Sequence, residues 1–146
     1  MSNVNEKNQQ LYQLTTLVAG KFSLQEVLDR LAEAAVKIIA VKACSIRLLD
    51  EEEGQLKMRS TYGLSEKYRN KGNVSIDDPV IKEAFAGKAV VIDDMRIDDR
   101  VQYKQASKNE GIVSQLTVVM QFREKSIGVL RLYSPKLKRF DEEVIC

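Results

Sequence analysis

Residues 114–134 read SQLTVVMQFREKSIGVLRLYS, and this stretch decides the fold that we predict for the chain. In its first half, apolar residues such as Leu116 and Val118 alternate with Gln, Thr or Val. Side chains of a β-strand point to opposite faces with a period of two, and residues 127–133 repeat the alternation. Residues 123–126, Arg-Glu-Lys-Ser, supply a turn, so the stretch predicts an antiparallel hairpin.

The two faces of this hairpin differ in character. One face is uniformly apolar and must be covered by other elements, for which helices are the expected partners. The other face mixes valine with Gln, Thr, Arg and Tyr. Such a face suits either solvent or the floor of a pocket that orients a ligand with a few polar groups. Both alternatives stay open at this point.

Composition and charge exclude several classes of protein. The 146 residues form one domain by size, and 23 basic against 21 acidic residues give a net charge of +2, which does not suggest a nucleic-acid partner. No apolar run approaches the roughly 18 residues of a membrane span, and the N-terminal residues are polar rather than a charged lead into an apolar stretch. We therefore expect a cytoplasmic protein without a membrane span. The chain lacks histidine, which excludes His-ligated metals or haem and His-dependent catalysis. We expect no cofactor, no metal site and no enzymatic activity.

Two helices are predicted before the first strand. Leucines recur at helical spacing over residues 7–19, and Gly20 is placed to end that helix. Its apolar stripe can pack on its own domain or on the same helix of a second chain. The second helix begins at the capping box Ser23–Glu26 and runs to about Ile39. The stripe of the first helix consists of Leu11, Leu14, Leu17 and Val18. The apolar face of the second consists of Leu24, Val27, Leu28, Leu31, Ala35 and Ile38.

The middle of the chain begins with another predicted hairpin. Residues 43–49 and 55–61 read as strands, and the acidic segment 50–54 forms their turn. Residues 62–75 predict a long loop with two glycines and several basic residues, and loops of this length in a compact domain are often lids.

Short elements follow this loop. An acidic cap before Pro79 starts a helix that Gly87 ends, and residues 89–92 predict a short buried strand. Asp98 or Asp99 is expected to cap a helix that reaches about Asn109. Residues 141–146 look like the first turn of one more helix, so we expect the chain to be a piece of a longer protein.

The order of these elements resembles that of the GAF domain, the small-molecule sensing module of signalling proteins. The resemblance implies an α+β fold with a mainly antiparallel sheet of five to six strands. It places the terminal helices on one face and a ligand pocket, under the loops and middle helices, on the other. It divides the chain into an N-terminal signalling or dimer helix at residues 1–20, a GAF domain at 21–140 and the start of a truncated helix at 141–146. The segments that carry the resemblance are LQEVLDRLAEAAVKIIAVKACSIRLLD (24–50), EEGQLKMRSTYGLS (52–65), PVIKEAFAGKAVVIDDMRIDDR (79–100), IGVLRLYS (127–134) and RFDEEVI (139–145).

Strand alternation within the implied fold directs a set of polar residues toward the pocket. Arg47 and Arg131 would present two guanidinium groups there, which suit a carboxylate or a phosphate. The alternative is that both arginines are exposed or pair with Asp93, Asp94 or Asp99. The predicted ligand-binding residues are Ser45, Arg47, Asp94, Gln115, Thr117, Arg131 and Tyr133.

Comparison with better-known GAF subtypes argues against a cyclic nucleotide, a bilin or haem as the ligand and against reduction of methionine sulfoxide. Cyclic-nucleotide-binding members resemble one another in an Asn-Lys pair after the last strand, where this chain has Tyr133-Ser134-Pro135-Lys136. Bilin-binding and haem-binding members use histidine, and members that reduce free methionine sulfoxide use a group of cysteines that Cys44 and Cys146 do not supply.

We therefore expect a regulatory sensor domain of a larger, bacterial-type signalling protein. It would bind an unknown small molecule, with an anion favoured by the two arginines, and relay its state through the terminal helices to an output domain in the same chain. The protein is expected to be a homodimer that pairs through the helix at residues 1–20. The alternative function is a ligand-free module that only pairs two chains.

Overall fold

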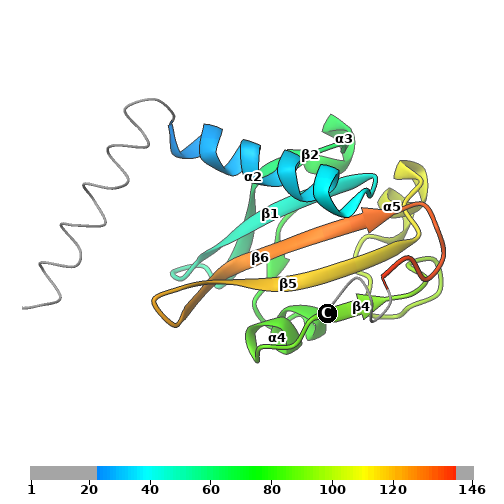
Figure 1. Cartoon of the computed structure of the whole chain (residues 1–146). Coiled ribbons are helices and arrows are strands. Elements are labelled where there is room, and N and C mark those ends of the chain that lie inside the picture. The colour runs from blue at the N-terminus through cyan, green and yellow to red at the C-terminus, as the bar shows by residue number, and fades with distance from the viewer. Residues whose placement is uncertain (1–22, 141–146) are drawn as a thin grey trace, which may run out of the picture.

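The computed structural model describes residues 23–140 of the chain (Figure 1). Six strands form one sheet in the order β3-β2-β1-β6-β5-β4, and every neighbouring pair is antiparallel. This arrangement confirms the predicted α+β fold with a mainly antiparallel sheet. The predicted dimer helix with Leu11, Leu14, Leu17 and Val18, and the predicted start of a final helix at 141–146, lie outside the described residues.

The helices and strands are short apart from α2 and the central strands. None of the helices within residues 23–140 is long and apolar enough to cross a membrane. The elements are α2 (Leu24–Ile39), β1 (Ala43–Asp50), β2 (Gln55–Tyr62), α3 (Glu66–Arg69), β3 (Val74–Ser75), α4 (Pro79–Phe85), β4 (Val90–Ile92), α5 (Lys104–Glu110), β5 (Ser114–Phe122) and β6 (Lys125–Ser134).

The hairpin of β5 and β6 lies at the centre of the fold and has the predicted alternation. Thr117 pairs with Arg131 and Leu116 with Leu132, so each face of the hairpin carries residues of one character. The turn is shorter than the predicted four residues. It consists of Arg123 and Glu124 alone, whose φ angles of 51° and 65° match the two-residue turn that follows the twist of the strands.

The helix α2 covers one face of the sheet (Figure 1). Alternate residues of the central strands, such as Cys44, Ile46 and Leu132, pack against it. The opposite face carries a second hydrophobic cluster that includes Tyr68 and Tyr133, to which α4 also contributes. The sheet is therefore buried on both faces, which explains why neither side of the central hairpin is wholly polar.

The predicted buried face of α2 is partly wrong. Its most buried residues are Leu28, Ala32 and Val36, spaced four apart. Of the residues that we predicted to be buried, Leu24, Leu31 and Ile38 are 55%, 41% and 79% exposed. Apolar residues occur around much of this helix, so its spacing alone does not decide which stripe meets the sheet. Contact with the sheet decides it, and the small, fully buried Ala32 allows a close approach of helix and sheet.

The caps of the short helices agree in part with the sequence. The side chain of Asp78 accepts hydrogen bonds from the backbone N–H groups of Val80 and Ile81, as expected for a cap before Pro79. The predicted capping of α5 by Asp98 or Asp99 is wrong, because α5 begins at Lys104 after a residue without a side-chain cap. Asp98 instead accepts from the backbone and guanidinium of Arg100.

The segment that we predicted to be a loop contains two short elements, α3 and β3. The side chain of Ser65 accepts from the backbone N–H of Tyr68 and starts α3, which buries the ring of Tyr68 against the second cluster. β3 then pairs with β2 at the edge of the sheet. Residues 62–75 therefore cover the face of the sheet opposite α2, and we call them the covering segment.

Candidate functional site

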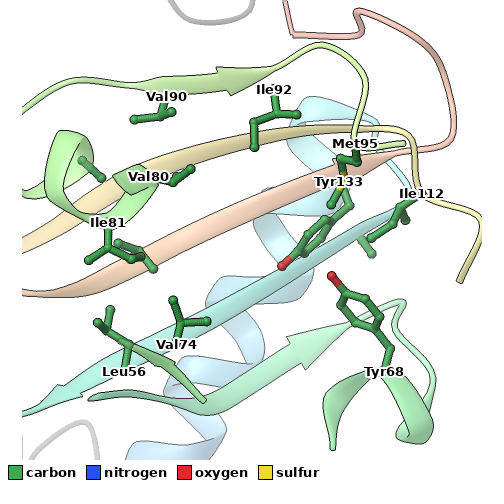
Figure 2. Close-up of a cluster of buried hydrophobic side chains, with 13 residues drawn as sticks. Leu56, Tyr68, Val74, Val80, Ile81, Val90, Ile92, Met95, Ile112 and Tyr133 are labelled. Atoms are coloured by element: carbon green, nitrogen blue, oxygen red, sulfur yellow. The ribbon is translucent and has the colours of Figure 1, made fainter. Parts of the chain in front are cut away.

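Two tyrosines mark the boundary between the sheet and the segment that covers it. Figure 2 shows Tyr133, from β6, and Tyr68, from α3, with their hydroxyl groups directed toward each other. Their rings lie 5.9 Å apart in an edge-to-face arrangement. The hydroxyl of Tyr133 is 2.9 Å from Oγ of Ser45, and that of Tyr68 is 3.4 Å from Oγ of Ser107. The hydroxyls are therefore partnered within an otherwise apolar cluster.

Arg131 lies on the same face of the sheet as Tyr133, two residues before it in β6. Its Nε donates to Oγ1 of Thr117 over 3.1 Å, and the same oxygen accepts from Nε2 of Gln115 over 3.2 Å. The residue is 8% exposed. Within residues 23–140 its guanidinium makes no other hydrogen bond and no ion pair. The two terminal nitrogens of this largely buried side chain therefore have no protein partner among residues 23–140, and they keep some contact with solvent.

Arg47 is a second buried arginine on this face and has no exposed surface. Its terminal nitrogens donate to the carbonyls of Leu56 and Gly72, each over 3.2 Å, while its Nε is buried without a partner. Burial lowers the pKa of Arg47, and the nearby charge of Arg131 acts in the same direction. The bond to Gly72 ties the sheet to the covering segment.

A small cavity lies beside these groups, between the sheet and the covering segment. Its volume is about 20 Å³, which is enough for one or two water-sized molecules. Its walls include Tyr68, Lys71, Tyr103, Gln115 and Arg131. The cavity is therefore lined by the unpartnered fork of Arg131 and by a lysine of the covering segment.

The amine of Lys71 lies against aromatic rings at the wall of this cavity. Its Nζ is 3.6 Å from the ring centroid of Tyr68 and 5.6 Å from that of Tyr103. Burial lowers the pKa of Lys71 to about 7, and the positive charges of Arg47 and Arg131 contribute to this shift. Glu110 opposes it. The amine is therefore partly neutral at neutral pH.

Charged groups of both signs border the cavity. Arg100 is one of them, and its guanidinium is paired with Asp98. Among the residues that the structure describes, neither Arg47, Lys71 nor Arg131 forms an ion pair. Asp78 also borders the cavity, but its Oδ1 caps α4. The carboxylate of Glu110 is bound to Ser65, which donates to it through both its backbone N–H and its hydroxyl. The cavity wall therefore holds the guanidinium of Arg131 and the amine of Lys71 without an ion pair, and the carboxylate of Asp78 lies in the same wall.

Six of the seven predicted ligand-binding residues are buried on one face of the sheet. They are Ser45, Arg47, Gln115, Thr117, Arg131 and Tyr133. Only Gln115 and Arg131 border the cavity itself. Their shared orientation follows from the pairing of β1, β6 and β5, which aligns residues of equal parity.

Asp94, the seventh predicted residue, lies apart from the others. Its carboxylate accepts from Arg96 over 2.8 Å and 2.9 Å and lies beside a separate open groove that Ile97 also lines. Arg47 and Arg131 are neither exposed nor paired with an aspartate, so that alternative interpretation is wrong.

The sequence missed Lys71 as a residue of the site. It lies in the stretch that we predicted to be a lid loop, where several basic residues gave no reason to prefer one of them. Gly72, the next residue, has a φ of 137°, and a Cβ there would meet Oη of Tyr103 at 2.5 Å. This close approach of the covering segment to Tyr103 places Lys71 at the cavity wall.

Lys71→Met is expected to remove a pH dependence of stability. The unfolded lysine has a pKa near 10.5 and the folded one near 7. Between these values the unfolded state binds one more proton, so the free energy of unfolding rises with pH by at most about 1.4 kcal/mol per unit. Solvent that reaches the amine reduces this slope. Urea denaturation at several pH values between 7 and 9 measures it.

The exposed lysine Lys108 provides the matched control for this prediction. Lys108→Met should keep the slope of the unmodified chain, whereas Lys71→Met should flatten it. Equal slopes for the unmodified chain and Lys71→Met would contradict a neutral amine at the cavity.

The fold and this site together define a class of α+β domain, in which a single antiparallel sheet carries a helix on one face and a small cavity with polar groups in its wall on the other. The family model for the GAF domain matches residues 23–145 of the sequence. The chain therefore belongs to the GAF domain family, as the resemblance of its segments indicated. No curated protein sequence matches it.

Solved structures share this fold at low sequence identity. The GAF domain of a phosphoenolpyruvate-protein phosphotransferase from Coxiella burnetii is 18% identical, with a TM-score of 0.70 over 98% of this chain and 86% of that one. Its counterpart from Acinetobacter is 23% identical, with a TM-score of 0.65 over 99% and 85%. Free methionine-R-sulfoxide reductase from Neisseria meningitidis is 19% identical, with a TM-score of 0.66 over 90% and 75%. These similarities concern the fold alone.

Proposed function

We propose that this GAF domain is a sensor that binds a small anion in the cavity beside Arg131. The proposal rests on the guanidinium of Arg131, which is largely buried, borders the cavity and has two terminal nitrogens without a partner among residues 23–140. A largely buried charge without a counter-charge is costly, and an anion in the cavity would offset that cost. Two parallel N–H groups of a guanidinium match the oxygens of a carboxylate or another planar oxyanion. Lys71 and Gln115 supply further donors on the same walls.

The cavity selects by size. Its 20 Å³ is far below the roughly 300 to 1,000 Å³ of pockets that enclose drug-sized ligands. A nucleotide would require the covering segment to move, whereas an ion of three or four heavy atoms requires only the loss of water and small side-chain shifts. The proposal therefore specifies small planar anions.

The covering segment offers a route by which the presence of a bound anion can be relayed to other parts of the protein. Arg47 donates to the carbonyl of Gly72, and the hydroxyl of Tyr103 donates to the carbonyl of Asn73 over 2.7 Å. An anion that draws Lys71 toward Arg131 changes the strain on these two bonds. A ligand shifts a conformational equilibrium only through unequal binding to the two states, and the position of residues 71–73 is the variable we propose. The relay would pass to an output domain of the same cytoplasmic protein.

The proposal includes no catalytic step. Cys44 is buried in β1, and burial raises the pKa of its thiol to about 12, so it is not an activated nucleophile. The likeness to a methionine sulfoxide reductase is a likeness of fold and supplies no second cysteine at this position.

A thermal and urea stability screen of the full chain tests the proposal. Formate, nitrate, acetate and phosphate are the probes, with chloride at equal ionic strength as the control. An anion at 100 times its dissociation constant should add about 2.7 kcal/mol to the free energy of unfolding. Formate and nitrate should act more strongly than phosphate because of the small cavity. A flat response to all four anions would refute an anion site.

A module that only pairs two chains is the second candidate, and one observation favours it. Leu24, Leu31 and Ile38 are exposed on α2 at intervals of seven residues, which is the spacing of a helix-to-helix seam. Such a homodimer is compatible with sensing. A flat anion response would leave pairing as the remaining proposal.

A further inference from the structure

Lys71 lies against aromatic rings, whereas Lys37 and Lys57 lie against carboxylates. Its Nζ lies against the rings of Tyr68 and Tyr103 and makes one long hydrogen bond of 3.4 Å, to the carbonyl of Tyr68. Lys37 and Lys57, by contrast, contact carboxylates that raise their pKa and keep them protonated. Lys71 has no carboxylate in contact with it among residues 23–140.

These surroundings give Lys71 a nucleophilic amine. An ordinary lysine has a neutral amine in roughly one of three thousand molecules at pH 7, because its pKa is near 10.5. The pKa of about 7 at Lys71 gives about half. A desolvated amine beside other cations is a known means of activating lysine. The chemical question is which electrophile the site admits.

The volume of the cavity limits the size of the electrophile, and the cations around it limit the charge of the product. A volume of about 20 Å³ admits a triatomic molecule and excludes most aldehydes and keto acids. The product must carry negative charge to relieve the repulsion among Lys71, Arg47 and Arg131, which acts against the ammonium form. Carbon dioxide meets both conditions, because it is a linear triatomic molecule and its adduct with an amine is a planar anion.

We propose that Lys71 is a carbamylation site for carbon dioxide, and that the carbamate is held by Arg131. The lone pair of Nζ forms a bond to the carbon, the electron pair of one C=O π bond moves to its oxygen, and one N–H proton passes to water. The two carbamate oxygens then present a carboxylate-like edge to the free nitrogens of Arg131, which borders the same cavity.

This inference rests on the proposed function and deepens it, since the anion that the site holds is made in place. The site would report dissolved carbon dioxide, because the carbamate forms reversibly and its occupancy follows the concentration of the gas.

Chemical trapping of the carbamate tests the inference. The full chain is equilibrated with ¹³C-labelled bicarbonate at about pH 7.5, where Lys71 is largely neutral and carbon dioxide is still present. The carbamate is then ethylated with triethyloxonium, and the peptides are analysed by mass spectrometry. We expect a ¹³C-shifted adduct on the peptide that contains Lys71 and none on the peptide of the exposed Lys108.

Two variants make the result specific. Lys71→Arg keeps the positive charge and should show no adduct. Arg131→Gln should lower the occupancy of Lys71 by roughly tenfold, as expected for the loss of a hydrogen-bonded charge. An unmodified Lys71 at saturating carbon dioxide would overturn the inference, as would equal labelling of Lys71 and Lys108.

The anion screen separates failure of this inference from failure of the proposed function. It is run in buffer purged of carbon dioxide, with formate and nitrate as probes. Stabilisation by formate in this screen, combined with no adduct on Lys71 in the trapping experiment with bicarbonate, would refute carbamylation and leave the anion site intact. An unmodified Lys71 together with a flat response to the anions would refute both.

Discussion

Arg131→Met is expected to make the domain more stable and, at the same time, unresponsive to anions. Arg131 is buried and charged, yet its only hydrogen bond among the described residues is to Thr117. Methionine has a similar length and carries no charge, so the substitution removes a desolvation cost. Replacing a buried ion pair by apolar residues of similar volume is often neutral or stabilising by about 1 to 4 kcal/mol, and we expect a gain within this range for Arg131, whose charge has no ion pair among residues 23–140. Urea denaturation measures this gain.

The hydrogen bonds around Arg131 support the sign of this prediction. Thr117 loses one donor but keeps the amide of Gln115, so the substitution leaves the hydroxyl oxygen of Thr117 with a partner. The gain of about 2.7 kcal/mol expected from a saturating anion should disappear in the same variant. Greater stability together with lost sensing is the signature of a group that is retained for function.

The exposed arginine Arg59 provides the control, since Arg59→Met should change neither the stability nor the anion response appreciably. A large loss of stability in Arg131→Met would mean that the guanidinium supports the fold. An anion response that survives the substitution would place the binding site elsewhere.

Gly128→Ala is expected to destabilise the domain by about 3 kcal/mol or more, the upper range for an overpacked core. Gly128 lies in β6 between Leu48 of β1 and Met120 of β5. A Cβ at this position would clash with the backbone oxygen of Arg47. Neither strand can move freely, because each is paired on both sides. Urea denaturation of the variant measures the loss.

The effect of Gly128→Ala should extend to the site. The clash lies at the backbone of Arg47, whose side chain holds the carbonyl of Gly72 in the covering segment. We therefore expect the variant to show a weaker response to formate even under conditions in which it remains folded.

Gly111→Ala is the matched control for Gly128→Ala. Gly111 ends α5 with a φ of 76°, and a Cβ there would meet nothing within 4 Å. Only the left-handed backbone conformation opposes alanine, at a cost of about 1 to 2 kcal/mol. Equal losses in the two variants would show that the contact with Arg47 is relieved by a small shift of the backbone.

Local patterns in the sequence were sufficient to predict the strands and the face of the sheet on which their side chains lie. The alternation in residues 114–134 assigned Leu116 and Leu132 to the helical face and Thr117 and Arg131 to the other, and the structure confirms both assignments. An alternation of this kind depends only on the pleat of one strand. It does not require knowledge of the partner that covers each face.

Local patterns were not sufficient to predict which face of α2 is buried or where the covering segment lies. Apolar residues lie on several sides of α2, and the sequence favoured a face that includes Leu31, whereas the sheet selects the face of Ala32. The segment that carries Lys71 has no strong periodicity. Its position depends on contacts with Arg47 and Tyr103, which lie far from it in the chain.

The sequence by itself determined the antiparallel sheet, the absence of histidine chemistry and the direction in which the two arginines point, because residue type and strand periodicity are local properties. Only the tertiary structure decided that the terminal nitrogens of Arg131 have no partner among residues 23–140, that Lys71 joins Arg131 at one small cavity and that Asp94 does not. Burial and the distances between charges arise when distant segments pack together, and these quantities set the charge state and the chemistry of the site.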